Sequence, residues 1–462
     1  MRATTTMTTP PLEPDQHSDD FLEEWRTLIA EQNQRGRTQV GSDPSPARTR
    51  PSDRQGRPGR LRALRAHLHL RDRPLWQKIT VGVIAVLILM PTLSLAHALL
   101  APSTLTTSER GAEWMRDNGL GGVLNQIEAW WAGLHPPKKG GEPDRAIETT
   151  TQETTPAGTK VVPPLPKPAA VPVPEGVTPV ANEGIWQPIG PLVGGAQSMY
   201  TTQVRPDSVH TSVLDGLVWM DPKLVRFEVH PGTQEPGGKS DIPSMIPVAD
   251  RLGLIAAFNG GFRMQDALGG FYLAGITYKP LRDGAASLVV YKNGVATVGA
   301  WGRDVTMSDD IQAVRQNLDL IIDNGGGPPN PAGTPAGKAA PGVPAAGLDN
   351  NANGAWGDTL GNKVLVWRSS VCVTATGALV YGYGGGLGAQ SLAELMLRAG
   401  CVRAMELDIN PSWTTFNFYA PTVPGDPNSV KGTKLLPDAE KSGDRYLSND
   451  TRDFVAVYAL PL

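Results

Sequence analysis

Apolar and polar positions along the chain form one long uncharged run and, further on, a series of short alternating segments. From Ile79 to Ala101 the sequence reads ITVGVIAVLILMPTLSLAHALLA and contains no Asp, Glu, Lys or Arg. A helix needs roughly 20 apolar residues to cross the hydrocarbon core of a bilayer, and such helices tolerate a proline such as Pro91. We therefore predict a transmembrane helix, placed at residues 76–101, rather than a buried core helix.

Short β-type segments separated by glycine turns dominate the C-terminal half. The segment ASLVVYKNGVATVGAW (286–301) has β-branched runs on both sides of Asn-Gly, which is the strongest short signal for a hairpin. The segment VCVTATGALVYGY (371–383) predicts a second hairpin that turns at Thr-Gly. RLGLIAAFNGGF (251–262) predicts a buried strand that enters a glycine turn, and TRDFVAVYAL (451–460) predicts a closing strand.

One helix among these strands has clear start and stop signals. In SLAELMLRAG (391–400), Ser391 and Glu394 form a capping-box pattern and Gly400 is positioned to end the helix. Antiparallel hairpins with scattered helices predict an α+β fold, with mixed, largely antiparallel sheets and a few packed helices. The predicted order is a disordered N-terminal tail, a single transmembrane helix and then this fold.

Composition divides the rest of the chain. Glycine (52) and proline (42) together exceed a fifth of the 462 residues, but they are unevenly distributed. Residues 1–75 are rich in Thr, Pro, Asp, Gln and Arg, which predicts a disordered cytoplasmic tail whose basic end lies against anionic lipid headgroups. Residues 102–183 predict short helices followed by a Pro/Thr-rich, extended spacer. Residues 184–462 are long enough for one large globular domain.

Charge predicts how the transmembrane helix is oriented. Six basic residues precede the apolar run and only Asp72 opposes them: Arg60, Arg62, Arg65, Arg71, Arg73 and Lys78. Because the basic flank stays in the cytoplasm, the protein is predicted to be a single-pass plasma-membrane protein with its C-terminal domain extracytoplasmic. The Ala-x-Ala pattern at Ala96 and Ala98 resembles a cleavage site, but the leader would be unusually long, so we expect an uncleaved anchor.

Net charge and cysteine content exclude some classes of protein. The formal net charge of -3 argues against a nucleic-acid partner. Cys372 and Cys401 both fall in the predicted outer domain, where they would form either a disulfide or buried unpaired thiols. No pair of histidines has zinc-ligand spacing, so we expect no cofactor.

Candidate chemistry concentrates in AMELDINPSW (404–413). Three polar residues alternate there with three apolar ones: Glu406, Asp408 and Asn410 with Met405, Leu407 and Ile409. Strand geometry would send the apolar set into the core and place the polar set on the opposite face, with alternate Cα atoms roughly 6.5 Å apart. Paired carboxylates suit proton transfer in glycoside hydrolysis or the binding of a hard cation such as calcium. A solvated edge strand is the alternative.

Several stretches, taken in chain order, resemble the phosphodiester glycosidase family. Its early motif matches Asn259, Gly260, Gly261 and Phe262, and its middle motif matches LDLIIDNG (318–325). In WRSSVC (367–372), Arg368 stands at the arginine of the family that enters a strand. LAELMLRAGCVRAMELDINPSW (392–413) then matches a helix, its spacing and Asp408. The resemblance covers roughly residues 210–460.

The sequence also departs from the family pattern next to Asp408. Glu406 stands where the family has asparagine, and Ile409, Asn410 and Pro411 replace a run of glycines, after which Ser412 matches. The resemblance implies the same fold more directly than the same reaction.

The resemblance together with the chemistry of each side chain gives the expected roles of these residues. Asp408 is the expected catalytic carboxylate, and Glu406 is a second candidate that would donate a proton or aid ligand binding. Arg368 would hold a phosphate or carboxylate, or else form a structural salt bridge to Asp408 or Glu406. Asn259, Gly260 and Gly261 would let backbone amides cradle a phosphate, or form a plain turn. Phe262, Asn410 and Ser412 complete the expected substrate contacts.

We therefore predict a membrane-anchored hydrolase that acts on a glycosidic bond, including a sugar-1-phosphodiester, in a cell-envelope glycan. Its expected partners are that glycan and the lipid bilayer, through residues 79–101. A non-catalytic glycan-binding module and a scaffold that binds a partner through its cytoplasmic tail are the alternatives.

Overall fold

A computed structural model describes residues 74–100, 105–149, 162–326, 340–349, 356 and 365–461. The chain divides into two compact units, Met1–Val86 and Leu87–Leu462, and the sheets and the candidate site belong to the second unit. The predicted tail, residues 1–75, lies almost entirely outside the described residues.

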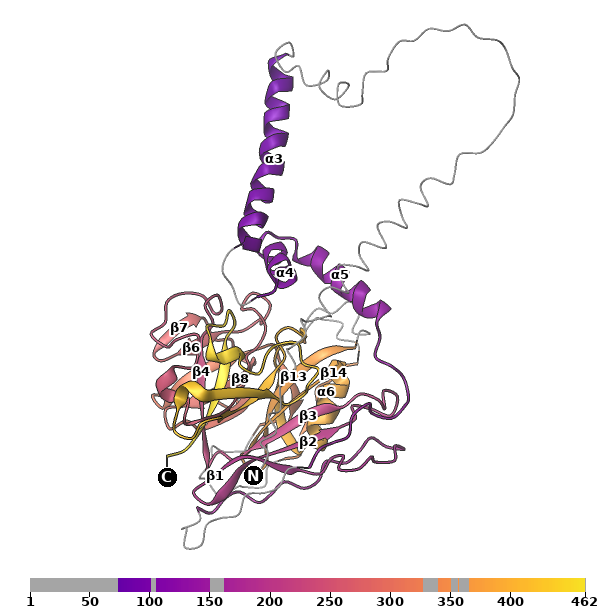
Figure 1. Cartoon of the computed structure of the whole chain (residues 1–462), viewed down its shortest axis with the longest axis vertical. Coiled ribbons are helices and arrows are strands. Elements are labelled where there is room, and N and C mark those ends of the chain that lie inside the picture. Colours follow the sequence, from indigo (N-terminus) through magenta and orange to yellow (C-terminus); the bar gives the residue numbers. More distant parts are fainter. Residues whose placement is uncertain are drawn as a thin grey trace, which may run out of the picture. The chain divides into compact units, whose positions relative to one another are not determined.

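Helix α3 corresponds to the predicted transmembrane helix (Figure 1). It spans Leu75–Leu100, one residue earlier at each end than predicted, and includes Pro91 without a break. None of its residues is buried, and among the described residues it is the one helix long and apolar enough to cross a membrane. The structure therefore contains a helix with the length and composition of a membrane span.

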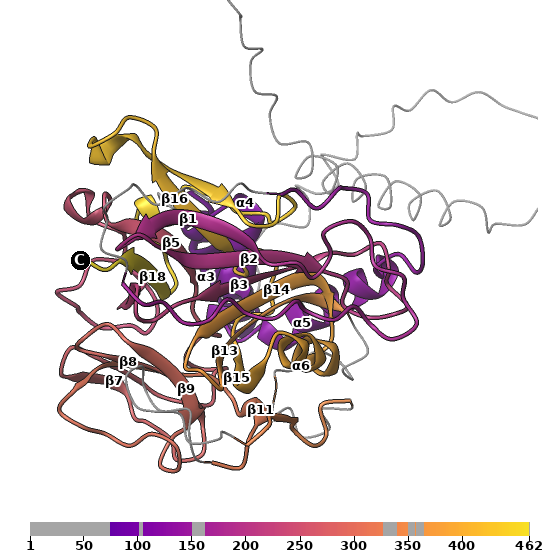
Figure 2. The same ribbon diagram turned by 90° about the horizontal axis from the view of Figure 1, so that it is seen from below.

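Three antiparallel sheets make up most of the described part of unit 2 (Figures 1 and 2). The eight-stranded sheet has the order β1-β2-β3-β14-β13-β15-β11-β12. Its strands are β1 Gln187–Val193, β2 Ala196–Val204, β3 Asp215–Met220, β14 Leu379–Leu387, β13 Val366–Thr374, β15 Cys401–Glu406, β11 Leu320–Asp323 and β12 Val343–Pro344.

The other two sheets have five strands each. One has the order β7-β6-β10-β8-β9: β7 Ile276–Lys279, β6 Phe271–Leu273, β10 Ile311–Gln316, β8 Ala286–Tyr291 and β9 Ala296–Ala300. The other has the order β17-β16-β5-β18-β4: β17 Val430–Lys434, β16 Phe416–Pro421, β5 Leu254–Asn259, β18 Phe454–Ala459 and β4 Val225–His230. Short 3-10 helices lie at η2 Val248–Asp250, η4 Pro427–Ser429 and η5 Arg445–Leu447. Antiparallel sheets with a few helices confirm the α+β class.

Both predicted hairpins are present. Strands β8 and β9 pair around Gly294, whose φ is 82°, and β13 and β14 pair around Gly377, whose φ is 87°. Glycine adopts this left-handed conformation without the steric cost that a side chain would add. The predicted buried strand is β5 and the predicted closing strand is β18, and these two strands pair with each other.

Helix α6, Ala389–Arg398, packs against the eight-stranded sheet at β13, β14 and β15. It begins before Ser391, so the predicted capping box of Ser391 with Glu394 is wrong. The Ser391 hydroxyl instead accepts the N–H of Gly388 at 2.9 Å, and Glu394 lies inside the helix. The helix ends as predicted before Gly400, whose φ is 89°.

One hydrophobic core joins all three sheets. It includes Leu217 of the eight-stranded sheet, Val298 of the second sheet and Phe258 of the third. Within the eight-stranded sheet, a disulfide bond links Cys372 of β13 to Cys401 of β15, with their Cα atoms 5.7 Å apart. The core and this bond together support the strand that leads to Asp408.

Helices α4, Thr107–Asp117, and α5, Gly121–Leu134, lie in the segment between α3 and the predicted spacer. Described parts of that spacer are hydrogen-bonded to the domain instead of standing clear of it. The N–H of Gly140 donates to Val209 O at 2.8 Å, and the N–H of Leu165 donates to the Asp221 carboxylate at 2.6 Å. An extended segment offers unpaired backbone groups that a neighbouring surface can satisfy. The boundary at residue 183 stays a prediction.

Candidate functional site

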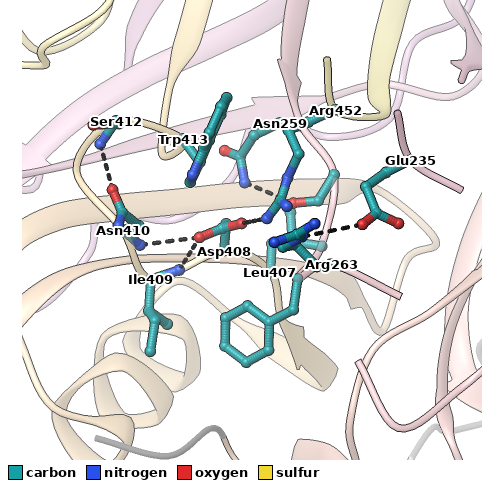
Figure 3. A network of polar contacts seen from close by, with 12 residues as sticks. Glu235, Asn259, Arg263, Leu407, Asp408, Ile409, Asn410, Ser412, Trp413 and Arg452 are labelled. Atoms are coloured by element: carbon teal, nitrogen blue, oxygen red, sulfur yellow. Dashed lines mark hydrogen bonds and ion pairs between the residues drawn. The ribbon is translucent and has the colours of Figure 1, made fainter. Parts of the chain in front are cut away.

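Asp408 lies just beyond the C-terminal end of β15, and three donors fix its carboxylate (Figure 3). Oδ1 accepts the N–H groups of Ile409 at 2.8 Å and Asn410 at 3.0 Å, and Oδ2 accepts Nη2 of Arg452 at 2.9 Å. Charge-assisted bonds of this kind give a carboxylate a defined orientation. Only 3% of Asp408 is exposed, so the carboxylate is at the edge of the buried interior.

Arg452 is one of two arginines at this site that the sequence pattern did not indicate. It lies two residues before the start of β18, and its guanidinium group lies 5.0 Å from the centre of the Trp413 ring. Within the described part of the chain, its Nε and Nη1 atoms are buried without a hydrogen-bond partner. A buried donor without an acceptor is costly, and a guanidinium group matches the oxygens of phosphate and carboxylate. Arg452 therefore has two donors available to an anion beside Asp408.

A second guanidinium group approaches from the residue after the Asn-Gly-Gly-Phe motif. Nε of Arg263 donates to Glu235 at 3.3 Å, and Figure 3 shows Arg263 beside Asp408 and Arg452. Arg263 also forms ion pairs with Glu113 at 3.3 Å and Asp117 at 2.5 Å, both on α4. The pattern around residues 259–262 offered no signal for these distant partners.

The pKa of Asp266 depends on both of these arginines, Arg263 and Arg452. Burial raises the pKa of its carboxyl group, and the charges of Arg263, Arg116 and Arg452 oppose that rise. Two of these three guanidinium groups, Arg263 and Arg452, are also the ones beside Asp408.

Cations also gather around the indole ring of Trp413, which is 3% exposed. Besides Arg452, the Arg445 guanidinium lies 5.1 Å from the ring centre and Lys441 Nζ lies 5.8 Å from it. Cations above an aromatic face are stabilised by its quadrupole. Trp413 therefore holds several positive charges near Asp408 despite their mutual repulsion.

Glu406 and Arg368 do not lie at an exposed surface. Both side chains have no exposed area, and they form an ion pair with each other, while Arg368 Nε donates to Leu387 O at 3.0 Å. Burial raises the pKa of Glu406, the Arg368 charge opposes that rise and the Asp408 charge adds to it. Of the alternatives left open by the sequence, the structure therefore has the salt bridge from Arg368 to Glu406 and not to Asp408.

The expectation of a shared polar face on this strand is wrong. Strand β15 lies between β13 and β11, with α6 against the same sheet, so every residue of β15 is buried. The strand ends at Glu406, and Asp408 follows in an irregular segment with its own orientation. Alternation therefore does not bring the two carboxylates to one solvated surface.

Asn259 connects three parts of the fold. Its Nδ2 atom donates to Gly260 O at 2.8 Å and to the Ser369 hydroxyl at 3.0 Å. Its Oδ1 atom accepts the Tyr381 hydroxyl at 2.6 Å and the N–H of Thr415 at 3.1 Å. Because both amide protons and both lone pairs are used, Asn259 positions the site and has no polar capacity left for a ligand.

The two glycines after Asn259 allow close packing and not left-handed backbone. Neither Gly260 nor Gly261 has a positive φ. A Cβ atom on Gly260 would lie 2.0 Å from the Asp453 carboxylate, and one on Gly261 would lie 2.6 Å from Oδ1 of Asn317. The N–H of Gly260 donates to Asp453 O and that of Phe262 to Asn317 Oδ1, both at 2.9 Å. The amides of Gly260 and Phe262 are therefore not free to form the expected phosphate cradle.

Asn410 and Ser412 shape the turn beside Asp408 (Figure 3). Oδ1 of Asn410 accepts the N–H of Ser412 at 2.9 Å, and the Ser412 hydroxyl donates to Glu440 at 2.7 Å. Their side chains thus stabilise the turn that presents the Ile409 and Asn410 amides to Asp408. Among the described residues, no group of three or more His, Cys, Asp or Glu could hold a metal ion, so the calcium alternative has no candidate cluster there.

No family model and no curated protein matches this sequence. Similar solved structures include the catalytic domain of zebrafish N-acetylglucosamine-1-phosphodiester α-N-acetylglucosaminidase, auto-inhibited by its pro-peptide. That likeness has 13% identity and a TM-score of 0.30, and covers 58% of this chain and 90% of that one. A hypothetical protein from Synechocystis has 13% identity and a TM-score of 0.29 over 57% of this chain and 63% of that one. A putative exported protein from Burkholderia pseudomallei has 15% identity and a TM-score of 0.28 over 54% and 74%. These values reflect only a distant relationship in fold.

Proposed function

We propose that the domain is an extracytoplasmic hydrolase, anchored in the membrane by α3, that cleaves the glycosidic bond of a sugar-1-phosphodiester in a cell-envelope glycan. The observation that carries this proposal is the oriented Asp408 carboxylate beside Arg452, whose Nε and Nη1 atoms are buried without partners in the described part of the chain. A carboxylate next to an anion-binding group suits a substrate that combines a reacting sugar carbon with a phosphate.

The chemistry follows from what each group offers. Cleavage of the bond between the anomeric carbon and the phosphate oxygen leaves positive charge on the sugar and negative charge on the departing phosphate monoester. Asp408 would stabilise the positive charge or orient the attacking water. Arg452 would stabilise the leaving phosphate, because fixed cations near developing negative charge lower the barrier.

This assignment does not need Glu406 as the proton donor. A phosphate monoester leaves as an anion that guanidinium groups stabilise, so proton donation to the leaving oxygen is less demanding than for an alcohol.

The first prediction concerns Asp408. The full chain, purified in nanodiscs, should release sugar from methyl sugar-1-phosphodiesters, and Asp408→Asn should lower the rate on the order of 100-fold or more, because the ionic carboxylate is lost. Sugar release is measured by chromatography across a panel of sugars. Asp309→Asn, at an exposed position, is the matched control.

A folded Asp408→Asn variant with full activity would remove Asp408 from the mechanism. Circular dichroism and the thermal midpoint establish that the variant is folded. Saturable binding by the wild-type chain without product, across the whole panel, would instead support a non-catalytic glycan-binding module. The complete burial of Glu406 favours that second function, since it leaves Asp408 without the expected carboxylate partner.

A further inference from the structure

Helix α4 presents an acidic face. Its three carboxylates, Glu109, Glu113 and Asp117, recur every four residues, which places them on one side of the helix. Like charges at this spacing destabilise an isolated helix, and an acidic residue in the last turn opposes the helix dipole. Glu109 also caps the start of α4, but the spacing of the three acids makes cations opposite this face favourable.

The cations opposite α4 belong to the candidate site. Lys441, which lies over Trp413, donates to Glu109 at 2.6 Å. Although burial would raise the pKa of Glu109, Lys441 holds it below its usual value. Arg263 pairs with both Glu113 and Asp117. The acidic face of α4 thus pairs with Lys441 and Arg263, two of the cations of the candidate site.

The contact between α4 and Arg263 is incompletely satisfied. The Glu113 side chain is 9% exposed, yet neither of its oxygens has a hydrogen bond, and Nη1 of Arg263 lacks one too. Nε and Nη1 of Arg452 are likewise buried without a hydrogen-bond partner among the described residues. Buried donors normally find partners, so the two unpartnered nitrogens of Arg452, and Nη1 of Arg263 with only its 3.3 Å ion pair, are donors available to an anion.

Phosphate has the chemistry to satisfy these donors. It offers several strong acceptor oxygens, and a guanidinium group binds two of them in parallel. Figure 3 shows Arg263 and Arg452 both beside Asp408, so their guanidinium groups are placed to contact one anion. The Glu113 carboxylate lies 3.3 Å from Nη1 of Arg263 without forming a hydrogen bond to it.

We propose that Arg263 and Arg452 form a phosphate subsite, and that Glu113 and Asp117 of α4 hold Arg263 in the substrate-free chain, so that phosphate and α4 compete for one guanidinium group. The inference rests on the proposed function and names the group of the substrate that this site selects. Arg263 is thereby a specificity-determining residue, and the carboxylates of α4 pair with it when no substrate is bound.

Binding of glucose 1-phosphate to the full chain in nanodiscs tests the subsite. Titration calorimetry compares it with glucose and with glucuronate, which distinguishes phosphate from a carboxylate or the sugar alone. Arg263→Gln should weaken glucose 1-phosphate binding about tenfold or more, the factor expected when one charged hydrogen-bond partner is lost. A wild-type chain that binds glucuronate or glucose as tightly as glucose 1-phosphate would overturn the phosphate assignment.

The competing helix is tested by a double variant. E113Q/D117N removes the two α4 charges that pair with Arg263, leaves its contact with Glu235, and should tighten glucose 1-phosphate binding about tenfold. E142Q/D144N changes the net charge equally at exposed positions and should leave the affinity unchanged. Equal affinities for the two double variants would show that α4 does not compete, and this variant remains informative if Arg263→Gln fails to fold.

Hydrogen exchange gives a readout independent of affinity. Glucose 1-phosphate should accelerate exchange of the α4 amides in the wild-type chain, and glucose should not, because only phosphate displaces the helix. Unchanged exchange at saturating glucose 1-phosphate would contradict displacement. None of these measurements requires turnover. If the binding and exchange effects occur without hydrolysis, only the proposed hydrolase is wrong. If hydrolysis occurs without these effects, only the proposed phosphate subsite is wrong.

Discussion

At the scale of single residues, the surroundings decide what an acidic side chain can do. Asp408 and Glu406 are two positions apart, yet one is oriented beside Arg452 and the other is enclosed with Arg368. A third acid, Asp215 of β3, is fully buried and has no hydrogen-bond partner on either oxygen in the described part of the chain. Three acids of similar intrinsic chemistry thus have three different roles.

The environment of Asp215 favours its neutral form. Burial raises its pKa well above the usual value, and Asp207 and Asp438 add to this, while Arg398 and Arg145 oppose it. Gly384 leaves room for the carboxyl group, since a Cβ atom there would lie 1.6 Å from Oδ1.

Replacing Asp215 should change how stability depends on pH. The folded chain keeps a proton on Asp215 that the unfolded chain releases above a pH of about 3.9, so stability falls as pH rises, by up to about 1.4 kcal/mol per pH unit, until the folded pKa is passed. Asp215→Asn removes this contribution, so its free energy of unfolding should decline less than that of the wild type between pH 5 and 8. Urea unfolding of the full chain measures the free energy of unfolding at each pH, and Asp309→Asn is the control variant. Parallel profiles for wild type and Asp215→Asn would contradict the assignment.

At the scale of elements, β13 and β15 position the site together. Strand β15 leads to Asp408, and β13 contributes Ser369, whose N–H and hydroxyl donate to Asp408 O at 3.0 and 2.8 Å. The disulfide between Cys372 and Cys401 joins these two strands across 29 residues of sequence that include α6. It therefore restrains the elements that fix the backbone of Asp408.

Loss of this disulfide should destabilise the domain substantially. For a closed loop of this length, the chain-entropy relation gives about 3–4 kcal/mol. C372S/C401S should lower the free energy of unfolding by that amount, measured by urea unfolding without reductant. Dithiothreitol should weaken the wild type and leave the variant unchanged. A loss below about 1 kcal/mol would mean that the bond adds little to the packing of β13 against β15.

At the scale of the whole molecule, two features of different origin favour an extracytoplasmic domain. One is the excess of basic residues before α3, which predicts a cytoplasmic N-terminus. The other is the disulfide in the domain, because such bonds persist in oxidising compartments. Helix α4, the described spacer segments and the sheets belong to one compact unit.

This topology can be measured with two fusions. Green fluorescent protein at the N-terminus should fluoresce, and alkaline phosphatase after residue 462 should be active, because each reporter works in the compartment predicted for that end. Both fusions should sediment with membranes. The opposite pattern of activities would contradict the orientation of α3, and soluble fusions would contradict the anchor.

The elements that sequence predicted are those specified by local features. The length of the apolar run predicted α3, Asn293-Gly294 predicted the β8–β9 hairpin, and Gly400 predicted the end of α6. Helix α6 was misplaced at its start because a serine before an apolar run has the same pattern at the N-cap and inside the first turn.

The sequence by itself determined where helices, hairpins and turns form, because these depend on neighbours within a few residues. Tertiary structure alone decided which charges meet. Arg263 and Asp117 are 146 residues apart, and Arg452 and Asp408 are 44 apart, so no local pattern relates them. The burial of Glu406 likewise depended on strands and a helix that cover β15 from elsewhere in the chain. Long-range packing sets the dielectric and the partners of each charge, and those set its chemistry.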